Sequence, residues 1–259
     1  MLALPPSQRL LVLTLALITR MLMHTNKTYG IPSISSILTK TSQFTCPGTS
    51  LKRYADTTTL IGEFMAFPPS SDRARTALAR THILHSGYRA HGSIREEDML
   101  YTLSLFATEP IRFIERFEWR SLTDLEKCAI GTYWQNVGEA LGISYEGLSA
   151  PTIHDQEKGE RKGFENGLHW LQAVKAWGNA YEQREMRPFE ANKVVADQTT
   201  NLILYGLPAI FRPAAVLFVS FMMDERLRCA MMFVFPFNNT RPLIIILPAP
   251  LLLLTQNKV

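Results

Sequence analysis

Apolar and polar residues alternate with a helical period through most of the chain. In residues 72–90 the apolar and small positions recur every three or four residues, at Ala74, Ala77, Leu78, Thr81 and Tyr88. That spacing is typical of one face of an α-helix. Residues 164–181 repeat it, and no segment shows the alternation and paired turns of β-hairpins. The pattern predicts an all-α protein: a single multi-helix domain of about eight helices.

Local signals mark several helix ends. Thr123 and Glu126 have the spacing of a capping box, and Gly142 stands where a helix C-terminal glycine is expected. Asp72 is predicted to cap the helix that follows it. A short helix is expected around residues 34–38.

The segment 94–117 carries a proline inside an apolar helical pattern. Glu96 and Glu97 fall in the first turn, where carboxylates favour the helix dipole. Pro110 is expected to kink or break the segment and to leave a second helix after it. Two further apolar helices are expected near residues 191–206 and 213–232, the latter with Pro213 at its first position.

Both ends of the chain are unusually apolar. Residues 10–19 form an apolar run between Arg9 and Arg20 that is shorter than the roughly 20 residues a helix needs to cross a bilayer. We therefore expect residues 1–24 to be a short apolar, basic N-terminal segment and a possible membrane anchor. Residues 25–232 are expected to form the helical domain, and residues 233–259 a proline-containing apolar tail.

Charge is distributed unevenly along the chain. The first 55 residues hold six of the 27 basic residues and none of the 23 acidic ones, so the rest has 21 basic against 23 acidic residues. A nucleic-acid-binding protein usually concentrates positive charge on its folded body, and the balance here argues against nucleic acid as a partner. A basic, acid-free N-terminus suits a membrane surface or an organelle-targeting segment.

Several motif-based functions are excluded. The three cysteines are far apart and form no CxxC pair, which argues against a disulfide framework and a zinc ribbon. The sequence has no HExxH, no GxSxG, no phosphate loop and no GxGxxG. Zincin-type peptidases, common hydrolases and nucleotide-binding enzymes are therefore poor interpretations.

The string RTHILHSGYRAHG at residues 80–92 contains three of the six histidines. His82, His85 and Arg89 follow one another by three and four residues and share a helix face, whereas His91 points elsewhere. A neutral imidazole is a good ligand for zinc, iron or haem iron. From spacing alone these histidines can be metal ligands, a catalytic base or polar residues on a solvated face.

The string KRYADT at residues 52–57 gathers a second polar set. In a helix, Arg53, Asp56 and Thr57 lie on one face. An arginine, a carboxylate and a hydroxyl together can orient a bound oxygen species or a propionate. The plainer interpretation is a polar network that braces the helix.

Longer strings carry a family resemblance. These are TYGIPSIS, KRYADT followed by LIGEF, HSGYR, EDMLYTL, EPIRFIERFEWRSLTDLEKCA, YGLPAIFRP and MMDERLRCAM. Between about Thr28 and Met231 the chain resembles the fungal ER-bound mpaB-type oxygenases. These share a domain with the rubber oxygenases called latex clearing proteins. The resemblance implies a rubber-oxygenase-like helical fold.

The resemblance also implies a cofactor site. Rubber oxygenases hold b-type haem through a histidine in an Arg-x-x-His-x-x-x-Arg pattern, and the matching positions here are His82, His85 and Arg89. His85 is thus expected to be the iron ligand, with Arg89 and His82 beside it at the cofactor. An Arg-x-x-Lys-Thr pattern on the other side of the haem corresponds to Arg53, Asp56 and Thr57, expected as catalytic residues, with aspartate in place of lysine.

The implied reaction is the oxidative cleavage of an isoprenoid carbon–carbon double bond with O₂. Asp56 is a candidate for the base that removes an allylic proton. The implied partners are a prenylated or isoprenoid small molecule, O₂ and a membrane, and the implied place is the endoplasmic reticulum or another intracellular membrane. Three alternatives stay open: a non-haem iron at the histidine, an acid–base enzyme that uses His85 and Asp56 without a metal, and a non-catalytic or degenerate membrane-associated paralogue.

Overall fold

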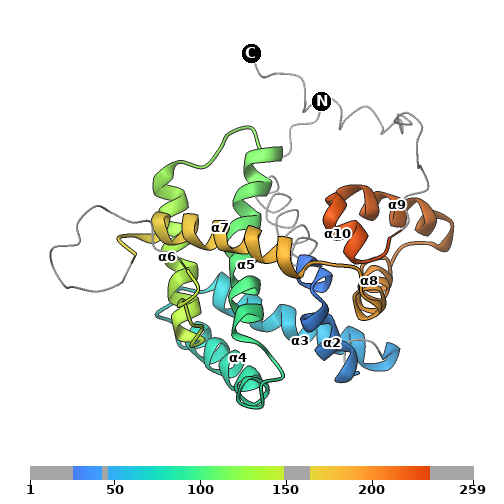
Figure 1. Cartoon of the computed structure of the whole chain (residues 1–259), viewed down its shortest axis with the longest axis horizontal. Helices are drawn as coiled ribbons and strands as arrows, with labels where there is room; N and C mark the ends of the chain where they lie inside the picture. Colours follow the sequence, from blue (N-terminus) through green and yellow to red (C-terminus); the bar gives the residue numbers. More distant parts are fainter. Residues whose placement is uncertain (1–25, 43–45, 149–163, 234–259) are drawn as a thin grey trace.

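The computed structural model describes residues 26–42, 46–148 and 164–233. In these ranges the protein consists of α-helices, two short 3₁₀ helices and connecting turns, without a β-strand (Figure 1). The prediction of an all-α domain is confirmed. The elements in chain order are η1 (Asn26–Gly30), α2 (Pro32–Lys40), α3 (Pro47–Ala66), α4 (Asp72–Ala90), α5 (Glu96–Phe117), α6 (Asp124–Ala140), α7 (Gly167–Glu185), α8 (Glu190–Ile203), η2 (Ala209–Phe211), α9 (Arg212–Met222) and α10 (Glu225–Ala230).

Helix α5 stands at the centre and contributes to two apolar cores. Leu100 and Leu103 belong to the first core, which α3, α4, α6 and α7 complete. Tyr101 and Leu105 belong to the second core, which lies against η1, α8 and α10. Because these pairs project from different sides of one helix, α5 joins the α3–α4–α6 side of the molecule to the α8–α10 side.

Helices α6 and α7 approach each other closely at Gly131. A Cβ atom added at Gly131 would lie 2.0 Å from the carbonyl oxygen of Gly167. Only a residue without a side chain fits there, and the core residue Trp134 follows one turn later on the same helix. This contact fixes α6, whose C-terminal end borders the candidate site.

Pro110 lies inside one continuous helix, α5. The expectation of a second helix after Pro110 is therefore wrong. An interior proline costs about 3 kcal/mol in an isolated helix because it removes a hydrogen bond and crowds the preceding turn. Here Ala107 and Ile111 on either side are buried in the core, and this packing holds the helix together across the proline.

The helix ends are partly as predicted. Thr123 and Glu126 form the capping box of α6, and Gly142 follows that helix with a φ of 66°. The cap of α4 is Ser71, whose hydroxyl accepts from the amide of Ala74, so the assignment of Asp72 as the cap was wrong by one residue. Asp72 begins the helix and pairs with Arg75.

The C-terminal apolar segment divides into two helices. Helix α9 begins at Arg212, with Pro213 in its first turn, and ends at Met222. Asp224 then caps α10 by accepting from the amide of Leu227. The single segment expected over residues 213–232 is thus a pair of helices with a sharp change of direction between them.

A buried ion cluster connects the N-terminal and C-terminal parts of the described chain. The ammonium of Lys27 lies 3.2 Å from Glu109, 3.1 Å from Glu182 and 3.5 Å from Asp224. Burial alone lowers the pKa of Lys27, but the facing carboxylates of Glu109 and Glu182 outweigh it and raise that pKa above its usual value. The cluster connects η1 with α5, α7 and the start of α10.

The predicted N-terminal segment 1–24 and most of the tail 233–259 lie outside the described residues. Within the described ranges, none of the helices combines the length and the apolar character that a bilayer-spanning helix requires.

Candidate functional site

The candidate site is built on the α3–α4 helical hairpin. The two helices pack against each other, and the short turn between Ala66 and Asp72 makes them antiparallel. The N-terminal part of α3 therefore lies beside the C-terminal part of α4. This arrangement brings together two strings that lie about 30 positions apart in the sequence, those around Arg53 and His85.

His85 presents one free ring nitrogen. Its Nδ1 lies 2.7 Å from the carbonyl oxygen of Thr81. Because a carbonyl can only accept, Nδ1 must carry the proton, and Nε2 keeps its lone pair. Burial lowers the pKa of His85, and the nearby charges of Arg53 and Arg89 lower it further. At neutral pH the side chain is thus a neutral imidazole with an oriented ligand nitrogen.

Arg89 and His82 are engaged with the end of α6. Arg89 donates from Nη1 to the carbonyl of Leu141 at 2.8 Å and from Nη2 to that of Gly142 at 2.6 Å. His82 Nδ1 donates to the same Leu141 carbonyl at 3.0 Å. Arg89 also pairs with Glu96 on α5. Both side chains therefore satisfy the open C-terminal carbonyls of α6 and brace α4 beside His85.

Arg53 lies between His85 and a pair of tyrosines. Its charge lowers the pKa of His85, and it also bears on Tyr29. Burial raises the pKa of Tyr29 to about 12, with Tyr54 as a further raising influence and Arg53 as a lowering one. Arg53 is exposed, and its charge acts on both the His85 imidazole and the buried Tyr29 phenol.

Asp56 and Thr57 lie on the exposed side of α3. The Asp56 carboxylate is 3.6 Å from the Lys52 ammonium, and the two side chains are 57% and 82% exposed. Thr57 donates its hydroxyl to the Arg53 carbonyl one turn earlier. Asp56 is not among the charged groups that shift the pKa of His85. The structure therefore places Arg53 near His85, whereas Asp56 forms an exposed ion pair with Lys52. The role of Asp56 as a base stays a prediction.

Three large apolar side chains are exposed on the α3–α4 hairpin. Leu84 and Tyr88 are neighbours of His85 on α4, and Leu51 lies at the same end of α3; all three are large and exposed. An exposed apolar patch beside a cation and a free imidazole nitrogen suits a flat, apolar group that carries carboxylates. Haem is one such group.

Metal-ligating side chains are not clustered among the described residues. Among the described residues, no group of three or more His, Cys, Asp or Glu side chains is placed to hold a metal ion. The usual protein-only sites for non-haem iron need several such ligands. A cofactor that brings its own equatorial ligands requires only one imidazole, which His85 provides.

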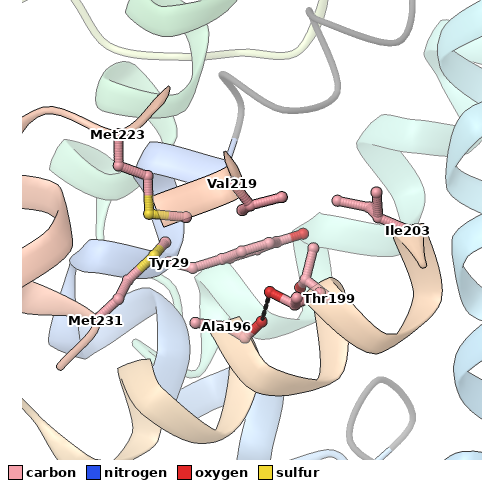
Figure 2. Close-up of a pocket in the computed structure, with 8 residues that line it drawn as sticks. Tyr29, Ala196, Thr199, Ile203, Val219, Met223 and Met231 are labelled. Atoms are coloured by element: carbon pink, nitrogen blue, oxygen red, sulfur yellow. Dashed lines mark hydrogen bonds between the residues drawn. The ribbon is translucent and has the colours of Figure 1, made fainter. Parts of the chain in front are cut away.

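A small cavity lies beside Tyr29, between α8 and α9 (Figure 2). The Tyr29 ring crosses it between Met223 and Met231 at one end and Ile203 and Val219 at the other. Its volume of about 10 Å³ is enough for roughly one water molecule. The cavity therefore cannot hold a substrate. Sequence reasoning missed Tyr29 as a neighbour of Arg53, since only the fold brings η1 to the start of α3.

An open groove of about 700 Å³ lies between α5, α7 and α10, with Lys27 and Glu182 at its base. Arg112, Lys175 and Arg226 line its sides. Neither this groove nor the Tyr29 cavity is lined by His85. His85, which is partly buried, therefore lies outside the lining of both hollows.

Comparison with known proteins identifies the family. Residues 8–233 match the model of the family described as ER-bound oxygenase mpaB/B'/rubber oxygenase, catalytic domain. The chain belongs to this family. The match takes in the whole described domain and extends into the N-terminal segment.

Curated members of the mpaB and rubber oxygenase family are similar over most of this chain. The ER-bound oxygenase mpaB of Penicillium roqueforti is 51% identical over 208 residues, which are 80% of this chain and 67% of that protein. The ER-bound oxygenase mpaB' of Penicillium brevicompactum is 51% identical over 210 residues, 81% of this chain and 48% of that protein. The mpaB of the same species is 51% identical over 178 residues, 69% and 43% of the two chains. The chain thus spans about half the length of two of these relatives.

Proposed function

We propose that this protein is a membrane-associated, haem-dependent oxygenase that cleaves a carbon–carbon double bond of an isoprenoid or prenylated small molecule with O₂. The observation that carries the proposal is the geometry of His85: Nδ1 lies 2.7 Å from the Thr81 carbonyl oxygen, and this bond places the proton on Nδ1 and the lone pair on Nε2. Membership of the mpaB and rubber oxygenase family supports the oxygenase class.

In this proposal His85 would hold the haem iron, and its neighbours keep its ring in place. The bond to Thr81 fixes the tautomer and the ring orientation, as outer-shell partners of metal-bound histidines commonly do. Arg89 and His82 anchor α4 to α6 through the Leu141 carbonyl and so keep the imidazole at a constant distance from the hairpin surface. When bound, haem supplies the redox-active iron at which O₂ is activated.

In this proposal Arg53 orients a negatively charged group of the bound cofactor or substrate. A guanidinium pairs with a carboxylate through two parallel hydrogen bonds, so Arg53 can hold a haem propionate or an acidic group of the substrate. It can equally donate to an oxygen atom on which negative charge develops during the reaction. Thr57, one turn further along α3, adds a hydroxyl on the same face.

The reaction balances without an external reductant. The carbon–carbon double bond breaks, the O–O bond breaks, and each of the two carbonyl products receives one oxygen atom of O₂. Asp56 is the residue we predict to accept the allylic proton and to return it before the products leave, because the overall reaction releases no proton. It can do so only when its exposed ion pair with Lys52 opens, because that pair now holds the carboxylate.

Attachment to the endoplasmic reticulum is also proposed. The relatives carry ER-bound in their names. An isoprenoid substrate dissolves in membranes, so an enzyme for such a substrate gains from a position at the bilayer. The basic, acid-free first 55 residues agree with this position.

The test is product analysis with isotopically labelled O₂. Purified full-length protein loaded with haem is incubated with a prenylated phenol, and the products are identified by mass spectrometry. We expect two carbonyl fragments with one labelled oxygen each, and their loss in the His85→Ala variant. Unchanged products and unchanged cofactor content in His85→Ala would contradict the role of His85, and a parent protein that forms no product would favour a non-catalytic paralogue.

A further inference from the structure

Helix α9 lies at the outer edge of the molecule (Figure 1), and this helix and the segment just before it carry large apolar side chains that are exposed. We call this surface the α9 face; its exposed apolar residues are Tyr205, Ile210, Phe211, Leu217, Phe218 and Phe221. Ile210 is 82% exposed and Phe221 68% exposed. Monomeric soluble proteins seldom expose contiguous patches of large apolar side chains unless these bind something.

The opposite side of α9 is already used in folding. Val219 and Ser220 are buried, and Val219 points into the cavity beside Tyr29 (Figure 2). Leu217, Phe218 and Phe221 project from the remainder of the helix circumference. Helix α9 is therefore apolar all round, and such a helix normally has apolar surroundings on every side. Its outer half lacks them within the described part of the molecule.

The charge of the segment points to a lipid surface. Between residues 204 and 223 the only charged residue is Arg212, which is positive and exposed. Phenylalanines and a tyrosine dominate the α9 face, and such side chains insert readily at the boundary between lipid headgroups and acyl chains. An arginine beside them is attracted to anionic headgroups.

The length of α9 decides the geometry. Its 11 residues give a helix of about 16 Å, too short to cross the hydrocarbon core of a bilayer. A contact of this helix with a membrane would therefore place it in the plane of the bilayer, with its outer half toward the lipid and its inner half on the protein.

We propose that the α9 face docks on the bilayer, with Phe211, Phe218 and Phe221 inserted between lipids and Arg212 at the headgroups. This inference rests on the membrane attachment proposed above and specifies the surface that makes it. It predicts that the domain itself contacts the membrane, in addition to any contact made by the chain ends.

The test uses full-length protein and single tryptophan substitutions. Phe221→Trp places a reporter on the α9 face. Leu125→Trp places one on α6, at a position 80% exposed and outside the α9 face. Both proteins are mixed with phosphatidylcholine vesicles, with and without phosphatidylserine, that carry bromine on their acyl chains. Since the native tryptophans are the same in both, any difference in quenching comes from the new side chain.

We expect clear quenching of Phe221→Trp beyond that of Leu125→Trp, and stronger quenching with phosphatidylserine present. Equal quenching of the two variants on vesicles that retain the protein would overturn the inference while leaving membrane attachment intact. Quenching of Phe221→Trp in a protein that binds no haem would leave the inference standing and remove the proposed function.

A second measurement determines how much Phe218 and Phe221 contribute to vesicle binding. Replacing both Phe218 and Phe221 with serine removes two large apolar side chains from the lipid. We expect the vesicle partition coefficient to fall about tenfold or more. The matched control replaces Trp119 and Leu125 with serine; these are 87% and 80% exposed and lie outside the α9 face. A self-association that the Phe218 and Phe221 changes abolish, without an effect on vesicle binding, would assign the face to a second copy of the chain and contradict the proposal.

Discussion

Burial lowers the pKa of His85, and the guanidinium of Arg53 on the facing helix lowers it further. Because its pKa is lowered, the partly buried His85 imidazole stays neutral at neutral pH, and a metal-binding histidine must be neutral. Arg53 also places a cation within reach of any carboxylate group bound beside His85.

Arg53→Gln tests the role of that cation. Loss of a charged hydrogen bond to a carboxylate costs about 1.5 to 3 kcal/mol, so we expect haem affinity to fall about tenfold to a hundredfold. Titration of the apoprotein with haem, followed by absorption, measures the effect. Lys52→Gln is the control, because it removes a neighbouring cation that is 82% exposed and paired with Asp56. Equal losses in the two variants would show that general surface charge, and not Arg53, is responsible.

Gly131→Ala tests the close contact of α6 and α7. The new methyl group would overlap the carbonyl of Gly167, so the two helices must move apart. We therefore expect the free energy of unfolding to fall by about 3 kcal/mol. Gly62→Ala is the counterpart: it lies inside α3 with nothing within 4 Å, and alanine there should stabilise the protein by about 0.5 to 1 kcal/mol. Urea unfolding followed by circular dichroism checks both. If the two substitutions have the same sign, the described contact is incorrect.

Lys27→Met tests the buried ion cluster. Removal of the ammonium leaves three carboxylates facing one another, two of them buried, and we expect a loss of about 3 to 5 kcal/mol in the free energy of unfolding. Lys193→Met removes the exposed pair with Asp197 and should cost no more than about 1 kcal/mol. Thermal unfolding of both variants decides the matter, and a Lys27 variant as stable as the control would show that the cluster contributes little.

Glu126→Gln tests the capping box of α6 through its pH dependence. The hydrogen bond from Arg120, and then those from Thr123, lower the pKa of Glu126 from 4.5 to about 2. A lowered folded-state pKa stabilises the protein fully above 4.5, and this contribution is lost as the pH falls toward 2. The melting temperature of Glu126→Gln should thus lie below that of the parent at neutral pH, and the gap should close in acid. Glu139→Gln, exposed on the same helix, should show no such convergence.

The sequence predicts the features of this fold that depend on neighbouring residues. The α6 capping box and Gly142 are confirmed because a cap needs only residues three or four positions apart. Asp72 was misassigned because Ser71 and Asp72 are both good caps and sequence alone does not separate them.

Features that depend on tertiary packing could not be predicted. Pro110 stays within α5 because core residues on both sides hold the helix, and no local rule reveals that. The tyrosine beside Arg53 comes from η1, more than 20 positions earlier in the chain, and its proximity follows only from the fold. Spacing predicts that His82, His85 and Arg89 share one helix face. Only the structure shows that His82 and Arg89 are hydrogen-bonded to the Leu141 carbonyl at the end of α6.

The absorption spectrum of purified, haem-reconstituted protein, with and without dithionite, tests the central claim most directly. We predict a Soret band that shifts on reduction, and its loss or strong change in His85→Ala. His91→Ala is the matched control, because His91 makes the same type of bond to a carbonyl four residues earlier on α4 but is exposed; it should keep the parent spectrum. A haem spectrum that is the same in His85→Ala as in the parent protein, or no haem binding by the parent protein at all, would contradict the assignment of His85 as the axial ligand.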